Sequence, residues 1–253
     1  KNYNFYSVKN IIKKINLIET NYFFKGYSIT SNSFLLNSPL DFNKILNKKY
    51  LQNKKIKNVN KQVLILGGSR GLGLVSTFFF LSRGYKVVST YAMYNNYLKN
   101  IKTKNLKIIK YNIMDNMNFE KIKTFAKNSE LIMFFAFPKI LNRSGNSFDK
   151  EYFNLMDNYN KVFINKILRN LKNKKIFYPS SIFINSLDEN YFAEYIKSKK
   201  LMEKYLKNAI IKCDLFIPRL PRFNTDQNIF NLNNDKLESI LKFEKYLKKF
   251  ENK

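Results

Sequence analysis

Residues 63–73 read Val-Leu-Ile-Leu-Gly-Gly-Ser-Arg-Gly-Leu-Gly, an apolar strand that runs directly into a glycine-rich turn. Four of the 7 glycines in the whole chain lie within this turn. Glycine adopts positive φ angles and lets a ligand approach the backbone closely, so this concentration indicates more than an ordinary strand–helix joint. An apolar run from Leu72 to Phe80 then opens a helix. The free N–H groups and the dipole of such a helix predict a phosphate-binding site at the turn.

Apolar runs alternate with helical stretches from this turn onward. We expect strands at 63–66, 86–91, 106–113, 131–137, 175–184 and 210–217. We expect helices at 74–83, 115–127, 149–171, 190–208 and 234–250, with Asp115 as an N-cap. This alternation predicts an α/β fold with a doubly wound parallel sheet of the Rossmann type. Ligands of such sheets bind at the carboxyl ends of the strands.

Residues 1–61 do not follow this alternation, and we treat them as an unassigned N-terminal appendage and linker. They contain a helical pattern near Val8–Ile18, a possible strand at Tyr22–Ile29 and a stretch rich in Lys and Asn at 48–61. Residues 62–253 then form the expected nucleotide-binding domain.

The formal net charge of +28 invites a nucleic-acid partner. However, the basic residues are 40 Lys against 6 Arg, alongside 37 Asn, and Lys, Asn, Ile, Phe and Tyr are all encoded by AT-rich codons. The lysines are scattered, and arginine, the better reader of phosphates and bases, is scarce. Codon bias therefore explains the charge, and we expect no nucleic-acid partner.

Several residue types exclude other classes of protein. The single cysteine, Cys213, rules out an internal disulfide and suits a reducing compartment, so we expect a cytoplasmic protein. The chain has no histidine, which removes the usual zinc ligands and any Ser–His triad, and we expect no metal site. No apolar stretch approaches the roughly 20 residues of a membrane span, so we expect no membrane partner.

The turn Gly67-x-x-x-Gly71-x-Gly73 after a strand resembles the nucleotide turn of the short-chain dehydrogenase/reductase family. Ser180–Ser181 end the expected fifth strand, and Tyr195-Ile-Lys-Ser-Lys199 follows, which is similar to the Tyr-x-x-x-Lys of that family. A Tyr-x-x-x-Lys match alone is uninformative in a chain with 17 tyrosines and so many lysines. The order of the three motifs and their spacing carry the resemblance, which covers roughly residues 62–226.

The resemblance implies a hydride-transfer enzyme with Tyr195 as general acid/base, Lys199 on the nicotinamide ribose and Ser181 on the substrate carbonyl. A phenol with a pKa of about 10 is a weak proton donor at neutral pH. A lysine four residues later lies on the same helix face, so we expect its charge to lower the pKa of Tyr195. Ser180 is the alternative to Ser181. The family's active-site asparagine would be Asn158, with Asn154, Asn160 and Asn165 as alternatives.

The same resemblance implies a dinucleotide site, whose expected residues are Gly67, Ser69, Arg70, Gly71, Leu72, Gly73, Asn112, Ile113, Ala136, Tyr195, Lys199 and Thr225. A site specific for NAD(H) usually places a carboxylate after the second strand, and Ser89-Thr90-Tyr91-Ala92-Met93 contains none. Arg70 stands where NADP-using members carry a basic residue that pairs with the 2′-phosphate. We therefore favour NADP(H) over NAD(H).

The chain departs from the family pattern at several positions. Leu66 replaces the usual Thr before the turn, Asn112 replaces an Asp toward the adenine, and residues 135–138 replace the usual Asn-Asn-Ala-Gly. Only 28 residues follow Thr225, so we expect a substrate pocket that is open or completed by another chain. The family often forms oligomers through the helices at 149–171 and 190–208, which leaves a homo-oligomer open.

These features favour an NADP(H)-dependent oxidoreductase that reduces the carbonyl of a small-molecule substrate to an alcohol. By analogy with the family, a 3-oxoacyl thioester or a polyketide-type ketone would be the substrate. The alternative is a nucleotide-binding or scaffold subunit that kept the fold and lost turnover. The joint presence of Ser181, Tyr195 and Lys199 favours the enzyme.

Overall fold

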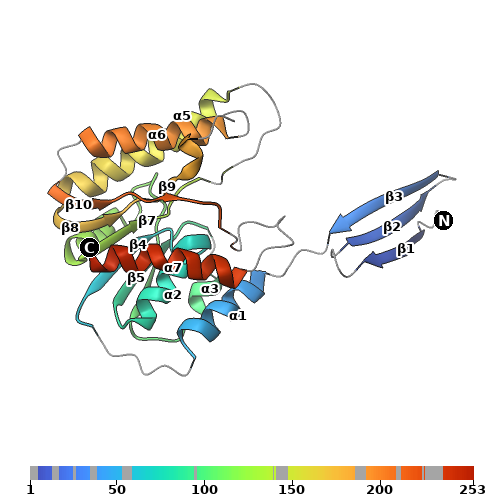
Figure 1. Ribbon diagram of the computed structural model, residues 1–253, viewed down its shortest axis with the longest axis horizontal. Helices are drawn as coiled ribbons and strands as arrows, with labels where there is room; N and C mark the ends of the chain where they lie inside the picture. Colours follow the sequence, from blue (N-terminus) through green and yellow to red (C-terminus); the bar gives the residue numbers. More distant parts are fainter. Residues whose placement is uncertain are drawn as a thin grey trace.

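The computed structural model describes residues 5–12, 17–24, 27–34, 39–52, 59–93, 96–138, 140, 148–185, 192–208, 212–223, 225 and 236–253. Its centre is a six-stranded, all-parallel sheet in the order β10-β8-β7-β4-β5-β6 (Figure 1). The strands are β4 (Gln62–Leu66), β5 (Lys86–Tyr91), β6 (Leu106–Lys110), β7 (Leu131–Phe134), β8 (Lys172–Phe177) and β10 (Lys212–Phe216). The order reverses between β4 and β7, so the predicted doubly wound parallel sheet is confirmed.

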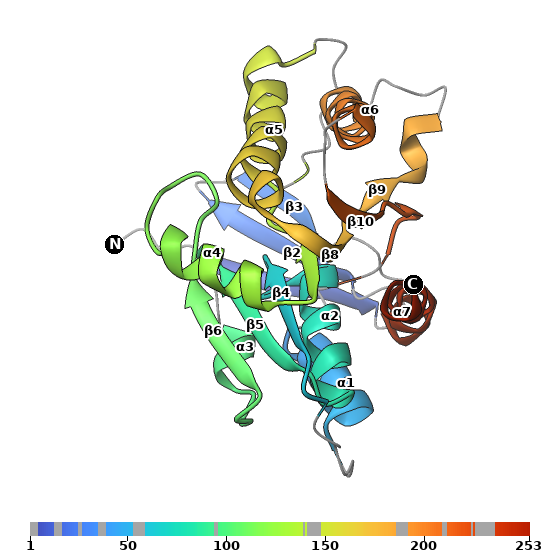
Figure 2. The same ribbon diagram turned by 90° about the vertical axis from the view of Figure 1, so that its left-hand side faces the viewer.

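Two layers of helices cover the sheet (Figure 1, Figure 2). One face carries α1 (Pro39–Tyr50), α2 (Gly71–Ser82), α3 (Asn96–Lys99) and α7 (Lys236–Asn252). The other carries α4 (Phe119–Asn128), α5 (Lys150–Val162), its continuation through a π-helical turn (Phe163–Ile167) and a 3₁₀ turn (Leu168–Asn170), and α6 (Ala193–Asn208). A short 3₁₀ turn, Ile182–Asn185, precedes α6.

Strand β4 shows why the chain folds into these layers. Val63 and Ile65 belong to the core on the α2 side, whereas Leu64 and Leu66 belong to the core on the α4 side. Successive side chains of a strand point to opposite faces, so a run of apolar residues suits a strand that is covered on both sides. All four side chains are 0% exposed.

Helix α2 is apolar around almost its whole circumference, because it lies between the sheet and two further helices. Its residues from Gly73 to Leu81 are buried. Phe42, Leu46 and Tyr50 of α1 and the buried stripe of α7 belong to the same core. Each fully buried side chain of this size stabilises the fold by about 1.5–3 kcal/mol. The boundary expected at residue 61 therefore leaves out a helix that packs into the domain.

The N-terminal segment departs from the sequence expectation. A three-stranded antiparallel sheet, β1 (Phe5–Ile12), β2 (Leu17–Phe24) and β3 (Tyr27–Phe34), lies to the right of the other elements in Figure 1. The helix expected near Val8–Ile18 is therefore wrong, and the strand expected at Tyr22–Ile29 is divided between β2 and β3. Val, Ile, Tyr, Phe and Thr are frequent here, and these residues favour strands.

The bounds of the remaining expected helices and strands agree with the structure within a few residues, and one expected strand is divided into two. The expected strand at 175–184 is the sheet strand β8 followed by β9 (Ser180–Ser181), which pairs in parallel with β11 (Arg219–Leu220) outside the main sheet. The helix expected from Asp115 begins at Phe119, and Asp115 instead accepts a hydrogen bond from the backbone of Met117. In the part of the chain that the structure describes, no helix is long and apolar enough to cross a membrane.

Candidate active site

The glycine turn between β4 and α2 is packed too closely for side chains. A Cβ atom on Gly67, whose φ is +80°, would lie 2.6 Å from the backbone nitrogen of Ala136. A Cβ on Gly73 would lie 2.2 Å from the carbonyl oxygen of Gly67. Gly71 has a φ of 55°, which glycine adopts without strain. The glycines therefore allow α2 to begin directly against the end of β4.

Hydroxyl groups from neighbouring elements fix the turn. The backbone N–H of Gly67 donates to Oγ1 of Thr90 at the end of β5, at 2.9 Å. The hydroxyl of Thr77 on α2 lies within hydrogen-bond distance of two carbonyl oxygens, that of Gly68 at 3.2 Å and that of Gly73 at 3.0 Å, and can donate to either. These bonds hold the turn although Leu66 lacks the hydroxyl expected at its position.

The N-terminus of α2 is suited to an anion. Arg70, at the N-cap position, makes no capping hydrogen bond with its side chain, and the first turn contains no acidic residue. The backbone N–H groups and the dipole at this end of α2 therefore favour a negatively charged ligand. Ser69, Arg70 and Leu72 are each partly exposed at this turn. The residues present thus fit the diphosphate of a dinucleotide.

The segment after β7 connects the turn to the expected catalytic residues. Gly67 lies against the backbone of Phe135 and Ala136. Phe137 directly follows Ala136. Its ring packs edge to face against the ring of Tyr195, with the ring centres 6.1 Å apart, and Lys199 Nζ lies 4.4 Å from the centre of the Phe137 ring. The glycine turn and the pair Tyr195/Lys199 therefore lie at the same carboxyl edge of the sheet.

The two adjacent serines have different partners. Ser181 forms a side-chain hydrogen bond with Tyr195. Ser180 Oγ instead donates to Glu203 Oε1 at 2.6 Å, and Glu203 forms a bidentate ion pair with Arg219, with Nη2 to Oε2 at 2.8 Å. Hydrogen bonding by Arg219 holds the pKa of Glu203 below its usual value, so it stays a carboxylate. Of the two serines, only Ser181 contacts the phenol.

The pKa of Tyr195 is shifted in the direction opposite to the expected one. Burial raises the pKa of Tyr195 to about 12, and the hydrogen bond with Ser181 only partly opposes this rise. The expectation that Lys199 lowers this pKa is therefore wrong. The reason is that burial also destabilises the charge of Lys199 and lowers its pKa to about 7. Tyr195 is a protonated phenol with part of its surface accessible.

Lys199 lies in a cage of aromatic rings and is 3% exposed. Its Nζ lies 4.4 Å from the ring centre of Tyr178 and 5.5 Å from that of Tyr195. Nζ donates to the hydroxyl of Tyr178 at 3.1 Å and to the carbonyl oxygen of Pro179 at 2.8 Å. The carboxylate of Glu203, one helical turn further along α6, favours the charged amine and partly offsets the burial.

The structure places Asn160, rather than Asn158, in this network. Asn160 is 0% exposed, and its Oδ1 accepts a hydrogen bond from the Tyr178 hydroxyl at 3.0 Å. Its Nδ2 donates to Ser198 Oγ at 2.9 Å. Asn158, two residues earlier, is exposed because a helix turns about 200° over two residues, and Asn154 and Asn165 are exposed as well. Of the expected asparagines, Asn160, one of the alternatives, therefore lies in the network around Lys199, and Asn158 lies outside it.

Three of the other expected cofactor residues, Asn112, Ile113 and Ala136, follow the carboxyl ends of β6 and β7. Asn112 is partly exposed, and its Oδ1 accepts from the backbone N–H of Met114 at 3.1 Å. The side chain of Ile113 belongs to the core, so only its backbone can face a ligand. Ala136 lies against the glycine turn, and Thr225 is 6% exposed.

Sequence reasoning missed Tyr178, Phe137, Glu203 and Arg219. Glu203 carried a usable signal, because residues 195, 199 and 203 recur every four positions and so share one face of α6. Asn160 was already an alternative, and its spacing favoured it, since it shares a helix face with the buried Met156, Phe163 and Ile167. Tyr178 and Arg219 lie on other elements, and no local spacing relates them to Lys199.

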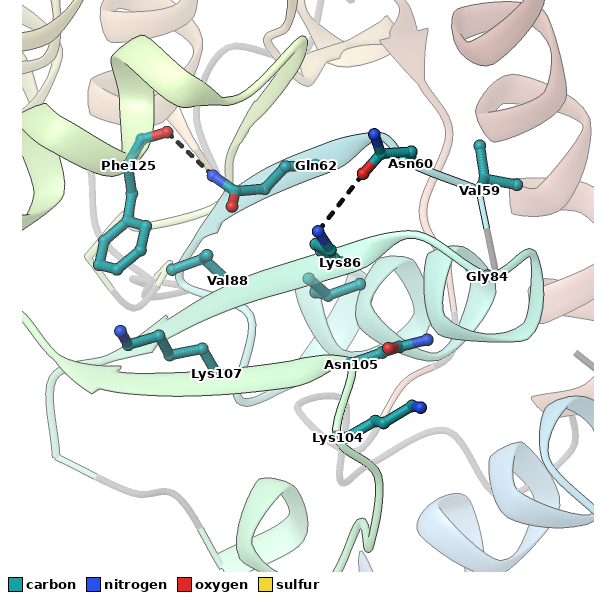
Figure 3. Close-up of a pocket in the computed structure, with 11 residues that line it drawn as sticks. Val59, Asn60, Gln62, Gly84, Lys86, Val88, Lys104, Asn105, Lys107 and Phe125 are labelled. Atoms are coloured by element: carbon teal, nitrogen blue, oxygen red, sulfur yellow. Dashed lines mark hydrogen bonds between the residues drawn. The ribbon is translucent and has the colours of Figure 1, made fainter. Parts of the chain in front are cut away.

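A cavity of about 540 Å³ lies at the opposite, amino edge of the sheet and is lined by residues such as Gln62, Lys86 and Lys107 (Figure 3). Its lysines do not converge on one point. Lys86 Nζ donates to Asn60 Oδ1 at 3.4 Å, whereas Lys107 Nζ lies 4.6 Å from the centre of the Phe125 ring. This cavity is separate from the residues around Tyr195.

A parallel sheet in this order, with a glycine turn after its first strand, defines a Rossmann-type nucleotide-binding fold. More particularly, it is the fold of the short-chain dehydrogenases/reductases. A short-chain dehydrogenase from Burkholderia cenocepacia in complex with NADP matches with a TM-score of 0.61 and 17% identity over 77% of this chain and 86% of that chain. BdcA in complex with NADPH matches with a TM-score of 0.55 and 17% identity over 69% and 75% of the two chains.

A 3-oxoacyl (acyl-carrier-protein) reductase from Agrobacterium tumefaciens with NADP bound matches with a TM-score of 0.53 and 12% identity, over 71% of this chain and 77% of that chain. No protein-family model matches the sequence, and none of the curated proteins does. At these identities the likeness concerns the fold, and the chemistry has to be argued from the site.

Proposed function

We propose that this chain is an NADP(H)-dependent oxidoreductase that reduces a carbonyl group to an alcohol. The observation that carries this proposal is the meeting of Ser181, Tyr195 and Lys199 at the carboxyl edge of the sheet, beside a turn suited to a diphosphate. A bound nicotinamide dinucleotide supplies the hydride for such a reduction. The chain itself must hold the substrate carbonyl and deliver a proton to its oxygen.

Tyr195 is the proton donor in this proposal. Its raised pKa keeps the phenol protonated at neutral pH, as donation to a developing alkoxide requires. In this proposal Ser181 donates to the same carbonyl oxygen, and its hydrogen bond to the phenol supports that role. Lys199, beside the ring, stabilises the phenolate left after the transfer whenever its amine is charged.

The preference for NADP(H) rests on charge at the turn. Arg70 precedes α2, and no carboxylate follows β5 that could bind a ribose 2′-hydroxyl or repel a 2′-phosphate. Three of the structures with this fold contain NADP or NADPH. By analogy with one of these, a 3-oxoacyl thioester is the first substrate to test.

The test compares the wild-type protein with Tyr195→Phe. Reduction of a panel of ketones and 3-oxoacyl thioesters is followed by loss of NADPH absorbance, and NADPH binding is measured by calorimetry. The variant should bind NADPH as the wild type does and lose turnover at least about a hundredfold. Tyr246→Phe, at a partly exposed tyrosine on α7, serves as a control for the loss of a hydroxyl. Equal turnover by Tyr195→Phe and the wild type would refute the role of Tyr195.

A nucleotide-binding subunit without turnover is the second candidate. The N-terminus of α2, whose first turn contains no acidic residue, supports nucleotide binding independently of any reaction at Tyr195. NADPH binding with no reduction of any compound in the panel, by the wild type as well as the variant, would favour this candidate.

A further inference from the structure

The buried amine of Lys199 is held by two acceptors from the strand end that follows β8. One is the backbone carbonyl of Pro179, and the other is the hydroxyl of Tyr178. Tyr178 is 0% exposed, and its ring stacks on Phe134 at 5.9 Å. The ring is thus locked in the core, and the hydroxyl has a fixed position against the lysine.

The direction of each hydrogen bond around Tyr178 follows from the groups beyond it. Asn160 Nδ2 donates to Ser198, so the oxygen of this amide faces Tyr178 and must accept from its hydroxyl. The Tyr178 oxygen then keeps its lone pairs for Lys199. Burial raises the pKa of Tyr178 well above its ordinary value, so the phenol stays protonated and this arrangement holds.

We propose that Tyr178 is a positioning residue for Lys199: its hydroxyl, oriented by Asn160, holds the amine of Lys199 beside Tyr195. The proposal rests on the proposed function for its purpose, although the contacts exist without any ligand. An ammonium has three N–H donors, and within the described residues two of them are used by Tyr178 and Pro179. One donor remains for a bound ligand.

Removing the Tyr178 hydroxyl should make the charged amine less stable. The charged form of Lys199 is opposed by burial and favoured by Glu203 on its own helix, and the phenols of Tyr178 and Tyr195 face it as neutral groups. A hydrogen bond to a charged group contributes enough to move a titration by about one pH unit. In Tyr178→Phe the ring and its stacking are kept, and only this acceptor is lost.

The experiment is a titration of the protein labelled with ¹³C-lysine, followed by NMR without cofactor or substrate. Lys199 should titrate near pH 7, and the signal is assigned by its absence in Lys199→Gln. In Tyr178→Phe the midpoint should fall by about one pH unit. Tyr111→Phe is the matched control, because Tyr111 is also a buried tyrosine and its hydroxyl has no hydrogen-bond partner among the described residues. Its midpoint should equal that of the wild type.

An unchanged midpoint in folded Tyr178→Phe would overturn the proposal, as would an equal fall in Tyr111→Phe. If circular dichroism shows Tyr178→Phe to be unfolded, Asn160→Leu removes the acceptor of the Tyr178 hydroxyl instead, and its midpoint should also fall; an unchanged midpoint there would overturn the proposal in the same way. The titration requires no turnover. An inactive wild-type protein would therefore count against the proposed function and leave this result standing.

Discussion

The buried amine of Lys199 should give the stability of the protein a specific dependence on pH. In the folded chain its pKa is about 7, against an ordinary value of 10.5 in the unfolded chain. Between these two values the unfolded chain binds more protons than the folded one, so stability rises as the pH rises. The charged buried amine lowers the free energy of unfolding by its full amount below pH 7. This loss of stability disappears above pH 10.5, the pKa of the lysine in the unfolded chain.

The magnitude follows from the two pKa values. Integrating the difference in bound protons from pH 7 to pH 9 gives a gain of about 2 kcal/mol in the free energy of unfolding. For a domain of this size, 1 kcal/mol shifts the melting temperature by about 2–4 °C. The Lys199 contribution should therefore raise the melting temperature by about 4–8 °C between these pH values.

The assay is urea unfolding at several pH values between 7 and 9, for the wild type and for Lys199→Met. Methionine keeps an unbranched side chain of similar length and cannot titrate. The free energy of unfolding of the variant should therefore lack the rise of about 2 kcal/mol between pH 7 and pH 9. Comparing the slopes removes the effects of the other lysines, which both proteins share. Parallel pH dependences in the two proteins would refute the claim that this amine is buried with a lowered pKa.

Four further substitutions test the rest of the site. Gly73→Ala places a methyl group 2.2 Å from the carbonyl oxygen of Gly67, so calorimetry should show a loss of about 1–3 kcal/mol and weaker NADPH binding; unchanged stability would contradict the packing of the turn. Arg70→Glu should weaken NADPH binding by about tenfold or more and leave NADH binding nearly unchanged, and equal effects on both would disprove the role of Arg70. Ser181→Ala should lower turnover with little loss of stability. Ser180→Ala should instead cost about 1–3 kcal/mol of stability, because it removes a hydrogen bond to the buried carboxylate of Glu203. The reverse pattern would exchange the roles of the two serines.

The parallel sheet was predictable because each of its strands is a local pattern. The apolar run at 63–66 and the glycine turn identify β4 and the start of α2 without knowledge of distant residues. The N-terminal strands were not predictable in this way. Val8, Ile11, Ile12 and Ile18 recur at intervals that also fit one face of a helix, and only the pairing of β1 with β2 decides between the two readings.

The proximity of Tyr195 and Lys199 was predictable from their spacing along one helix, but the electrostatics around them were not. A lysine four residues after a tyrosine is expected to lower the tyrosine's pKa only if the lysine keeps its charge. Whether it does depends on burial by Phe137 and Tyr178, which come from two different strand ends. No spacing along α6 contains that information.

The geometry of the short strand β9 determines which partner each of the adjacent serines Ser180 and Ser181 binds. Alternation along β9 sends the two hydroxyls to different partners, so one serine binds Glu203 and the other binds Tyr195. Both partners lie on α6, eight residues apart, with Lys199 midway between them. The ion pair of Glu203 with Arg219 on β11 fixes this end of the arrangement, because the guanidinium binds both oxygens of the Glu203 carboxylate. Through Glu203, Arg219 therefore supports the position of Ser180, and through the strand that of the neighbouring Ser181.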